Sequence, residues 1–237
     1  MRRAPAEILR EYGPFEGDQV AGVTHDGRQV WIATGASIKA FDPADGEVKR
    51  SFDIAAHAGT AFDGKHLYQI AEAHIQKVDP DSGEVISTIP APAAGGDSGL
   101  AWAEGSLWVG AYRDRKIHQI DPATGRILRS IPCTRFVTGV TWVDGELWHG
   151  TWEDDVSDIR RIDPASGEVL EQLTCPRAPA SRGWRPMAAR RCIAAAVAAA
   201  RCARSDVRSG PPAEHERALD HLARTSQIAG CYFASDV

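Results

Sequence analysis

The chain has 237 residues and a formal net charge of −5 at pH 7, with 27 Lys and Arg against 32 Asp and Glu. This balance argues against the basic surface that binds nucleic acid. The first residues are charged and no apolar segment follows them, and no run of about 18 apolar residues occurs, so we expect neither a secretory signal nor a membrane span. We therefore expect a cytoplasmic, monomeric protein without nucleic-acid or membrane partners.

The chain between residues 1 and 176 contains four copies of a unit of about 40 residues, a period typical of repeat architectures. Each copy opens on a glycine and carries an Asp-Pro pair, and these begin at Gly22, Gly59, Gly99 and Gly139 and at Asp42, Asp79, Asp121 and Asp163. An acidic residue followed by glycine, as in Asp26-Gly27, suits a tight hairpin turn. The Asp-Pro-x-x-Gly segment suits a second turn, because proline presets φ and glycine supplies a positive φ. Each copy therefore predicts four short antiparallel strands.

Four such strands per copy are typical of a β-propeller blade, and a sandwich or an open meander is the alternative. The propeller is favoured because an aromatic residue recurs at one place in each copy, where it can fill the wedge between neighbouring blades. These residues are Trp31, Tyr68, Trp108 and Trp148. The sequence thus predicts an all-β propeller domain over 1–176, with four complete four-stranded blades at about residues 18–55, 56–92, 95–133 and 135–176.

Two further segments concern the closure of the ring. Residues 7–15 resemble the fourth strand of a copy but have no first three strands ahead of them, which predicts the closing strand of a fifth blade in a five-bladed-type propeller. Residues 177–237 lose the β pattern, and their Ala/Arg-rich composition predicts a helical or disordered, non-propeller tail. Back-translation with GC-rich codons in a shifted frame can restore a Gly-Leu strand, an Asp-Gly turn and a Leu-Tyr strand. We therefore interpret the tail as a frameshift product.

The fourth copy, GVTWVDGELWHGTWEDDVSDIRRIDPASGEVL, resembles a blade of the plant-type glutamine cyclotransferases, also called glutaminyl-peptide cyclotransferases. The likeness covers residues 7–176 and implies a five-bladed propeller and a transferase that cyclises N-terminal glutamine with release of ammonia. The chain also looks like the virginiamycin-B-lyase and quinoprotein-like propellers, in which IDPxTG turns are common. The cyclotransferase family carries catalytic glutamates on its inner strands. Here Gly139 and Thr141 stand at the matching positions, and Asp97 is the acid kept near a second such segment.

Propeller ligands usually lie over the central channel, on the face formed by the loops between blades and between the second and third strands. Two of these loops put an aromatic residue beside a charge at equivalent positions, Tyr112-Arg113 and Trp152-Glu153. This combination suits a small polar ligand or a peptide N-terminus. Arg113 and Arg115 would clamp a carboxylate. The alternative is a solvated loop with surface ion pairs that contribute little.

The catalytic candidates are Asp97, Glu153 and His149, because a carboxylate or an imidazole can bind an amine or transfer a proton. Gln69 and Thr138 complete the candidate ligand-binding residues. Three functions stay open at this point. They are a glutamine cyclotransferase-like enzyme, a non-catalytic ligand-binding or interaction propeller, and a lyase of the virginiamycin-B type that would use His149 with Glu153.

The sequence contains no clear motif for a metal or a cofactor. No Walker, Rossmann or metal-ligand spacing occurs, so we expect no cofactor and no metal site. The stretch Asp154, Asp155 and Asp158 offers carboxylates for Ca²⁺, but its spacing differs from that of an EF-hand loop. The five cysteines include no CxxC pair and are odd in number, which argues against a closed disulfide set.

Overall fold

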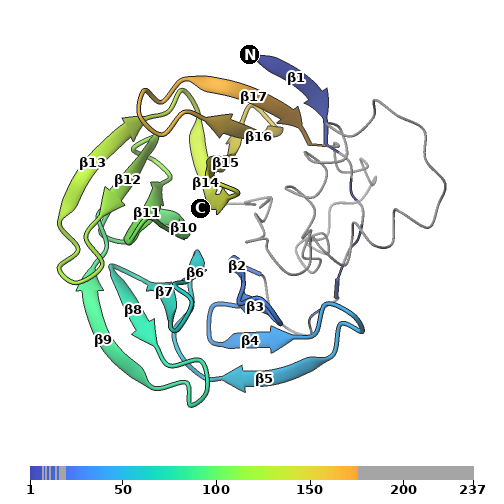
Figure 1. Ribbon diagram of the computed structural model, residues 1–237, viewed down its shortest axis with the longest axis vertical. Coiled ribbons are helices and arrows are strands. Elements are labelled where there is room, and N and C mark those ends of the chain that lie inside the picture. The colour runs from blue at the N-terminus through green and yellow to red at the C-terminus, as the bar shows by residue number, and fades with distance from the viewer. Residues whose placement is uncertain (7, 9, 11, 14, 16–19, 176–237) are drawn as a thin grey trace.

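The structure, a computed structural model, describes residues 1–6, 8, 10, 12, 13, 15 and 20–175. These residues contain seventeen β-strands and no helix, so none of them belongs to a helix that could cross a membrane. Four antiparallel units of four strands are arranged around a common axis as blades of a propeller, and β1 adds a fifth strand to the last blade (Figure 1). The predicted all-β propeller with four complete four-stranded blades is confirmed.

The strands follow one another from the axis outward in every blade. Blade 1 contains β2 (Gly22–His25), β3 (Val30–Ala33), β4 (Ile38–Phe41) and β5 (Val48–Phe52). Blade 2 contains β6 (Thr60–Phe62), β7 (Leu67–Ala71), β8 (His74–Val78) and β9 (Val85–Pro90). Blade 3 contains β10 (Asp97–Ala103), β11 (Ser106–Ala111), β12 (Lys116–Ile120) and β13 (Ile127–Pro132). Blade 4 contains β14 (Phe136–Val143), β15 (Glu146–Glu153), β16 (Val156–Ile162) and β17 (Val169–Thr174).

The repeated glycine lies where the innermost strands of neighbouring blades approach one another. A Cβ atom on Gly59 would collide with the backbone of Gly99 and Leu100, and one on Gly99 would collide with the backbone of Gly139 and Val140. Only a residue without a side chain fits such a backbone contact. The glycine that marks the start of each of the first three copies is therefore a packing requirement of the ring.

The wedge aromatics lie between successive blades, as expected. Tyr68 of blade 2 stacks on Trp102 of blade 3, and Trp108 of blade 3 stacks on Trp142 of blade 4, with ring centroids 5.6 Å apart in both pairs. Trp31 belongs to the apolar cluster between blades 1 and 2. Stacked pairs of this kind contribute beyond the apolar area that they bury. The hydrophobic core is therefore divided into layers, one at each interface between blades.

The hairpin turns follow the predicted chemistry with one difference. The glycine of each Asp-Pro-x-x-Gly turn has a positive φ, and these residues are Gly46, Gly83, Gly125 and Gly167. Glu104 and Gly105 in blade 3 both have positive φ, as a tight two-residue hairpin requires. The same loop has equal length in blade 1, but its glycine stands one position earlier, and the carboxylate of Asp26 accepts the backbone N–H groups of Arg28 and Gln29. The shifted glycine changes the turn without changing the blade.

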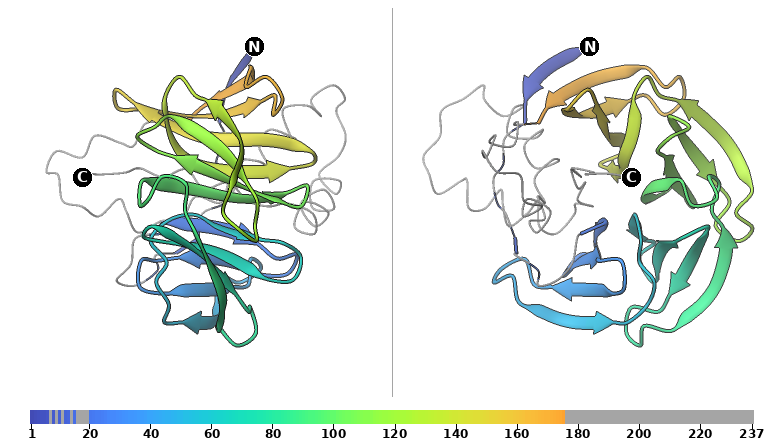
Figure 2. Two further views of the ribbon diagram at one scale, coloured as in Figure 1. Left: turned by 90° about the vertical axis from the view of Figure 1, so that its left-hand side faces the viewer. Right: turned by 180° about the vertical axis from the view of Figure 1, so that it is seen from behind.

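The N-terminal segment contacts both the last blade and the first. β1 (Arg2–Pro5) pairs in parallel with β17, and the N–H of Ala6 donates to the carbonyl of Thr174 at 2.8 Å. The views in Figure 2 show β1 along the outer side of blade 4. Further along, the hydroxyl of Tyr12 donates to the carbonyl of Pro43 in blade 1 at 3.0 Å. Pairing through Arg2–Pro5 was not predicted, because this stretch shows no alternation of apolar and polar residues.

The structure describes only part of the segments that were expected to close the ring. The closing strand was predicted at residues 7–15, and several of these positions lie outside the described residues. The other strands of a fifth blade also lie outside them. The predicted non-propeller tail at 177–237 also lies outside them. What the structure adds is that Tyr12, within the predicted closing strand, packs on Phe41 of blade 1, with ring centroids 5.0 Å apart.

Candidate functional site

Two irregular inner strands lie next to each other in blades 3 and 4. The register of β10 shifts between Asp97 and Gly99, and that of β14 shifts between Val137 and Gly139. Each shift leaves one residue out of the ladder, Ser98 in β10 and its counterpart Thr138 in β14. β-Bulges are frequent beside binding sites because they redirect neighbouring side chains. The two bulges therefore make the beginning of β10 and β14 a candidate binding region.

The Ser98 side chain ties the two bulged strands together. Its hydroxyl lies 2.6 Å from the carbonyl oxygen of Val137 in blade 4 and 3.1 Å from that of Gly110 in its own blade. The Thr138 side chain is buried at the equivalent place in blade 4. The inner edge of the interface between blades 3 and 4 is therefore held by polar contacts as well as by apolar packing.

Asp97 is the first residue of β10 and carries a buried carboxyl group, with 7% of the residue exposed. Its Oδ1 accepts the N–H of Ala93 at 3.0 Å, while its Oδ2 has longer contacts, 3.2 Å to the same N–H and 3.4 Å to that of Gly95. Burial, reinforced by the charge of Asp114, raises the pKa of Asp97, although these amide contacts act in the opposite direction. Asp97 is thus a carboxyl group that holds a proton more tightly than an ordinary aspartate.

Three aromatic side chains form a row from blade 3 to blade 4, which we call the aromatic row (Tyr112, Phe136 and Trp152). The Tyr112 and Phe136 ring centroids are 4.9 Å apart, and those of Phe136 and Trp152 are 6.4 Å apart. All three residues are partly exposed. The N–H of Tyr112 donates to the carbonyl of Gly96 at 2.9 Å, so the row begins at the same end of blade 3 as Asp97.

Arg115 and Glu153 border the aromatic row. The guanidinium of Arg115 lies 4.4 Å from the centre of the Phe136 ring and donates to the Glu153 carboxylate at 2.6 Å. It also donates to the carbonyl of Thr134 at 3.1 Å. The pair joins the β11–β12 loop to the end of β15, and its two charges compensate each other. Because both side chains are partly exposed, we expect the pair to orient these loops more than to stabilise the fold.

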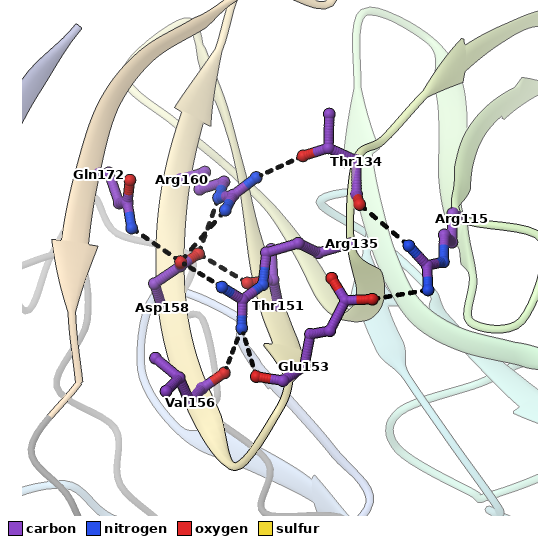
Figure 3. A network of polar contacts seen from close by, with 9 residues as sticks. All are labelled: Arg115, Thr134, Arg135, Thr151, Glu153, Val156, Asp158, Arg160 and Gln172. Carbon is purple, nitrogen blue, oxygen red and sulfur yellow. Dashed lines mark hydrogen bonds and ion pairs between the residues drawn. The ribbon is translucent and has the colours of Figure 1, made fainter.

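A buried polar network lies behind this border (Figure 3). Its centre is Asp158 on β16, of which 1% is exposed. The Asp158 carboxylate accepts hydrogen bonds from three side chains: Thr151 at 2.6 Å, Arg160 at 2.8 Å and Gln172 at 2.8 Å. A second guanidinium, that of Arg135, forms an ion pair with it at 3.5 Å. One buried carboxylate therefore forms ion pairs with two guanidinium groups.

Arg135 connects the buried network to the β15–β16 turn at the surface. Its guanidinium donates to the backbone carbonyls of Glu153 at 2.8 Å and Val156 at 2.5 Å, which are the two ends of the β15–β16 turn. The places equivalent to Asp158 in blades 2 and 3 are held by His74 and Lys116, and both are exposed. Among the four blades, blade 4 therefore buries a carboxylate there and uses it to fix the loop that carries Glu153.

Two predicted site residues lie away from the aromatic row. His149 on β15 is 2% exposed, and burial, followed by the charge of Arg160, lowers its pKa to about 4, so the imidazole is neutral at pH 7. Gln69 belongs to blade 2, where its amide N–H group contacts the carbonyls of Ala58 and Ile70. Both residues face the preceding blade.

The structure brings most of the remaining candidates together. They lie at the beginning of β10 and β14, in the β11–β12 loop and at the end of β15: Asp97, Thr138, Tyr112, Arg115, Trp152 and Glu153. Arg113 is exposed and forms no hydrogen bond or ion pair with the residues that the structure describes. Phe136, the first residue of β14, was missed from the sequence, although an aromatic residue directly after the connection between two blades was an available signal.

The three aspartates considered for Ca²⁺ have different surroundings. Asp154 and Asp155 are exposed at the tip of the β15–β16 hairpin, whereas the Asp158 carboxylate is bound by arginine side chains inside the blade. Across the described residues, no group of three or more His, Cys, Asp or Glu side chains is arranged to hold a metal ion.

No protein-family model and no curated protein matches this sequence. Solved structures do share its fold. Glutaminyl cyclase from Myxococcus xanthus superposes with a TM-score of 0.63 at 19% identity, over 73% of this chain and 78% of that chain. Hydrazine synthase from Kuenenia stuttgartiensis gives 0.50 at 20% identity, over 71% and 52%. A protein of unknown function from Bacteroides caccae gives 0.50 at 17% identity, over 70% and 65%. At these identities the likeness is one of β-propeller fold.

Proposed function

We propose that this propeller binds the N-terminal glutaminyl residue of a peptide over blades 3 and 4 and cyclises it with release of ammonia. The observation that carries the proposal is Asp97, a buried carboxyl group of raised pKa at the start of an innermost strand, at the same end of blade 3 as the aromatic row. Acids whose pKa is perturbed by burial at such a place are candidates for proton transfer. The likeness in fold to a glutaminyl cyclase supports the same reaction class.

The reaction requires one proton transfer that Asp97 is suited to make. The α-amine nitrogen of the substrate attacks the carbon of its own γ-carboxamide, and the new C–N bond closes a five-membered lactam. The bond from that carbon to the amide nitrogen breaks. A proton leaves the attacking amine for the Asp97 carboxylate and then passes to the departing nitrogen, which leaves as ammonia. We assign the transfer to Oδ2, because this oxygen has the longer contacts to backbone amides.

The test is ammonia release from a glutaminyl peptide by the full chain and by Asp97→Asn. Asparagine keeps the shape of the side chain but cannot accept the proton, so kcat should fall by about 100-fold or more. Glu84→Gln, an exposed acid on the outer side of blade 2, is the matched control and should keep the activity. A folded Asp97→Asn protein with undiminished ammonia release would contradict the proposal.

A second candidate is a non-catalytic propeller that binds the same kind of ligand. The observation in its favour is that both candidate acids already have partners. Asp97 accepts hydrogen bonds from backbone N–H groups, and Glu153 accepts one from Arg115. This function predicts that a glutaminyl peptide raises the melting temperature by mass action while no ammonia appears. Ammonia release that depends on Asp97 would reject it in favour of the enzyme.

A further inference from the structure

We propose that the aromatic row is the subsite for the second residue of the peptide and that it selects a flat, apolar side chain there. The inference rests on the proposed function, because it takes the N-terminal glutamine to lie at Asp97. The contact that connects the two places is the hydrogen bond from the Tyr112 N–H to the Gly96 carbonyl, one residue before Asp97. We take a peptide with its first residue at Asp97 to extend across this end of blade 3 to Tyr112 and then to Phe136, which stacks on Tyr112.

The charges around the aromatic row favour an uncharged side chain. Arg115 and Glu153 neutralise each other at 2.6 Å, so neither is left to compensate a charge on the peptide. A carboxylate or ammonium placed on the rings would lose water without gaining a partner, which is unfavourable. An apolar side chain loses no such interaction and gains contact with three partly exposed rings.

The rings are also held in place before any ligand arrives. Phe136 and Trp152 are cross-strand partners in the β14–β15 ladder. The Arg115–Glu153 pair connects the β11–β12 loop, which carries Tyr112, to the end of β15, which carries Trp152. Arg135 fixes the β15–β16 turn through its contacts to the Glu153 and Val156 carbonyls. A surface ordered in this way loses little conformational entropy on binding, which favours selectivity.

The first experiment compares kcat/KM for Gln-Phe-Ala, Gln-Gly-Ala and Gln-Glu-Ala with the full-length protein. We expect Gln-Phe-Ala to exceed the other two by about tenfold, the effect of an aromatic contact of about 1.4 kcal/mol. Phe136→Ala should remove this preference, whereas Glu84→Gln, the exposed control on blade 2, should keep it. Trp152→Leu keeps an apolar residue at the end of the row, and we expect it to reduce the preference partly while preserving the fold.

Binding of peptides that cannot cyclise separates this inference from the proposed reaction. By calorimetry, Ala-Phe-Ala should bind about tenfold more tightly than Ala-Gly-Ala, and Phe136→Ala should abolish the difference. A preference for Ala-Phe-Ala without ammonia from any glutaminyl peptide would uphold the subsite and reject the reaction. Equal ammonia release from Gln-Phe-Ala and Gln-Gly-Ala would overturn the subsite and leave the reaction standing.

Discussion

His149 shows how the environment of one side chain makes the stability of the molecule depend on pH. Its imidazole is buried between blades 3 and 4, and its pKa falls from 6.5 in the unfolded chain to about 4 in the folded one. Between these values the unfolded chain binds a proton that the folded protein does not, so the free energy of unfolding decreases as the pH falls. The contribution is complete above pH 6.5 and is lost toward pH 4.

His149→Gln should remove this dependence. Gln69 occupies the equivalent place in blade 2, which indicates that glutamine fits there. From pH 7 to pH 5 we expect the free energy of unfolding of the unaltered protein to fall by about 2 kcal/mol more than that of the variant. Urea unfolding at the two pH values measures the difference. Equal losses in both proteins would show that the folded protein protonates His149 as readily as the unfolded chain does.

Asp158 illustrates the energetics of a buried charge. Asp158→Asn leaves the guanidinium groups of Arg135 and Arg160 inside the blade without a carboxylate, and breaking such a pair should reduce the free energy of unfolding by about 3 kcal/mol. Asp81→Asn is the matched control, because the Arg50–Asp81 pair is exposed and should contribute less than about 1 kcal/mol. Urea unfolding of both variants measures this. A loss below 1 kcal/mol for Asp158→Asn would mean that the network does not hold the β15–β16 hairpin.

At the scale of strands, the ring depends on backbone contact between inner strands. Gly59→Ala would place a Cβ atom against the backbone of Gly99 and Leu100, and backbone cannot move aside as a flexible side chain can. We expect the free energy of unfolding to fall by about 2–3 kcal/mol. For Gly96→Ala the nearest atom is the Ala93 carbonyl oxygen at 3.3 Å, so this control should lose less than about 1 kcal/mol. Similar losses in the two variants would contradict the close packing of inner strands.

The elements that could be predicted from the sequence are those that repeat. Four strands per copy, the turn residues and the wedge aromatics all recur at a fixed place, and each recurrence has one physical explanation. The pairing of Arg2–Pro5 with β17 and the Asp158 network could not be predicted in this way. Each occurs once and depends on contacts between distant segments, and no period in the sequence specifies such contacts.

In the candidate site, too, the repeated features could be predicted and the contacts that occur once could not. Tyr112 and Trp152 were predicted because they occupy equivalent loops in two copies, and the structure connects them through Phe136. The ion pair between Arg115 and Glu153 was missed because the residues belong to different blades. Sequence reasoning therefore identified the loops and most of the side chains, but not which of them contact one another.

At the scale of the whole molecule, the faces at the two ends of the blade series show how the ring would close. Trp148 of blade 4 occupies the place at which Trp31 and Trp108 face the next blade, and its cluster includes Ala4 and Ala6 of the N-terminal segment. We propose that a fifth blade belongs there and that residues 177–237 are translated out of frame. Sequencing the gene across codons 170–240 decides it. An alternative frame encoding a Gly-Leu strand and an Asp-Gly turn is expected, and its absence would reject the proposal.

We propose that a glutaminyl peptide is bound and cyclised where blades 3 and 4 meet, and a crystal structure with the product pyroglutamyl-Phe-Ala would show where the peptide lies. We expect the lactam within about 3 Å of the Asp97 carboxyl group, as a hydrogen bond requires, and the phenylalanine ring against Phe136. A product seated over another blade, or one that leaves Asp97 without a contact, would contradict the account.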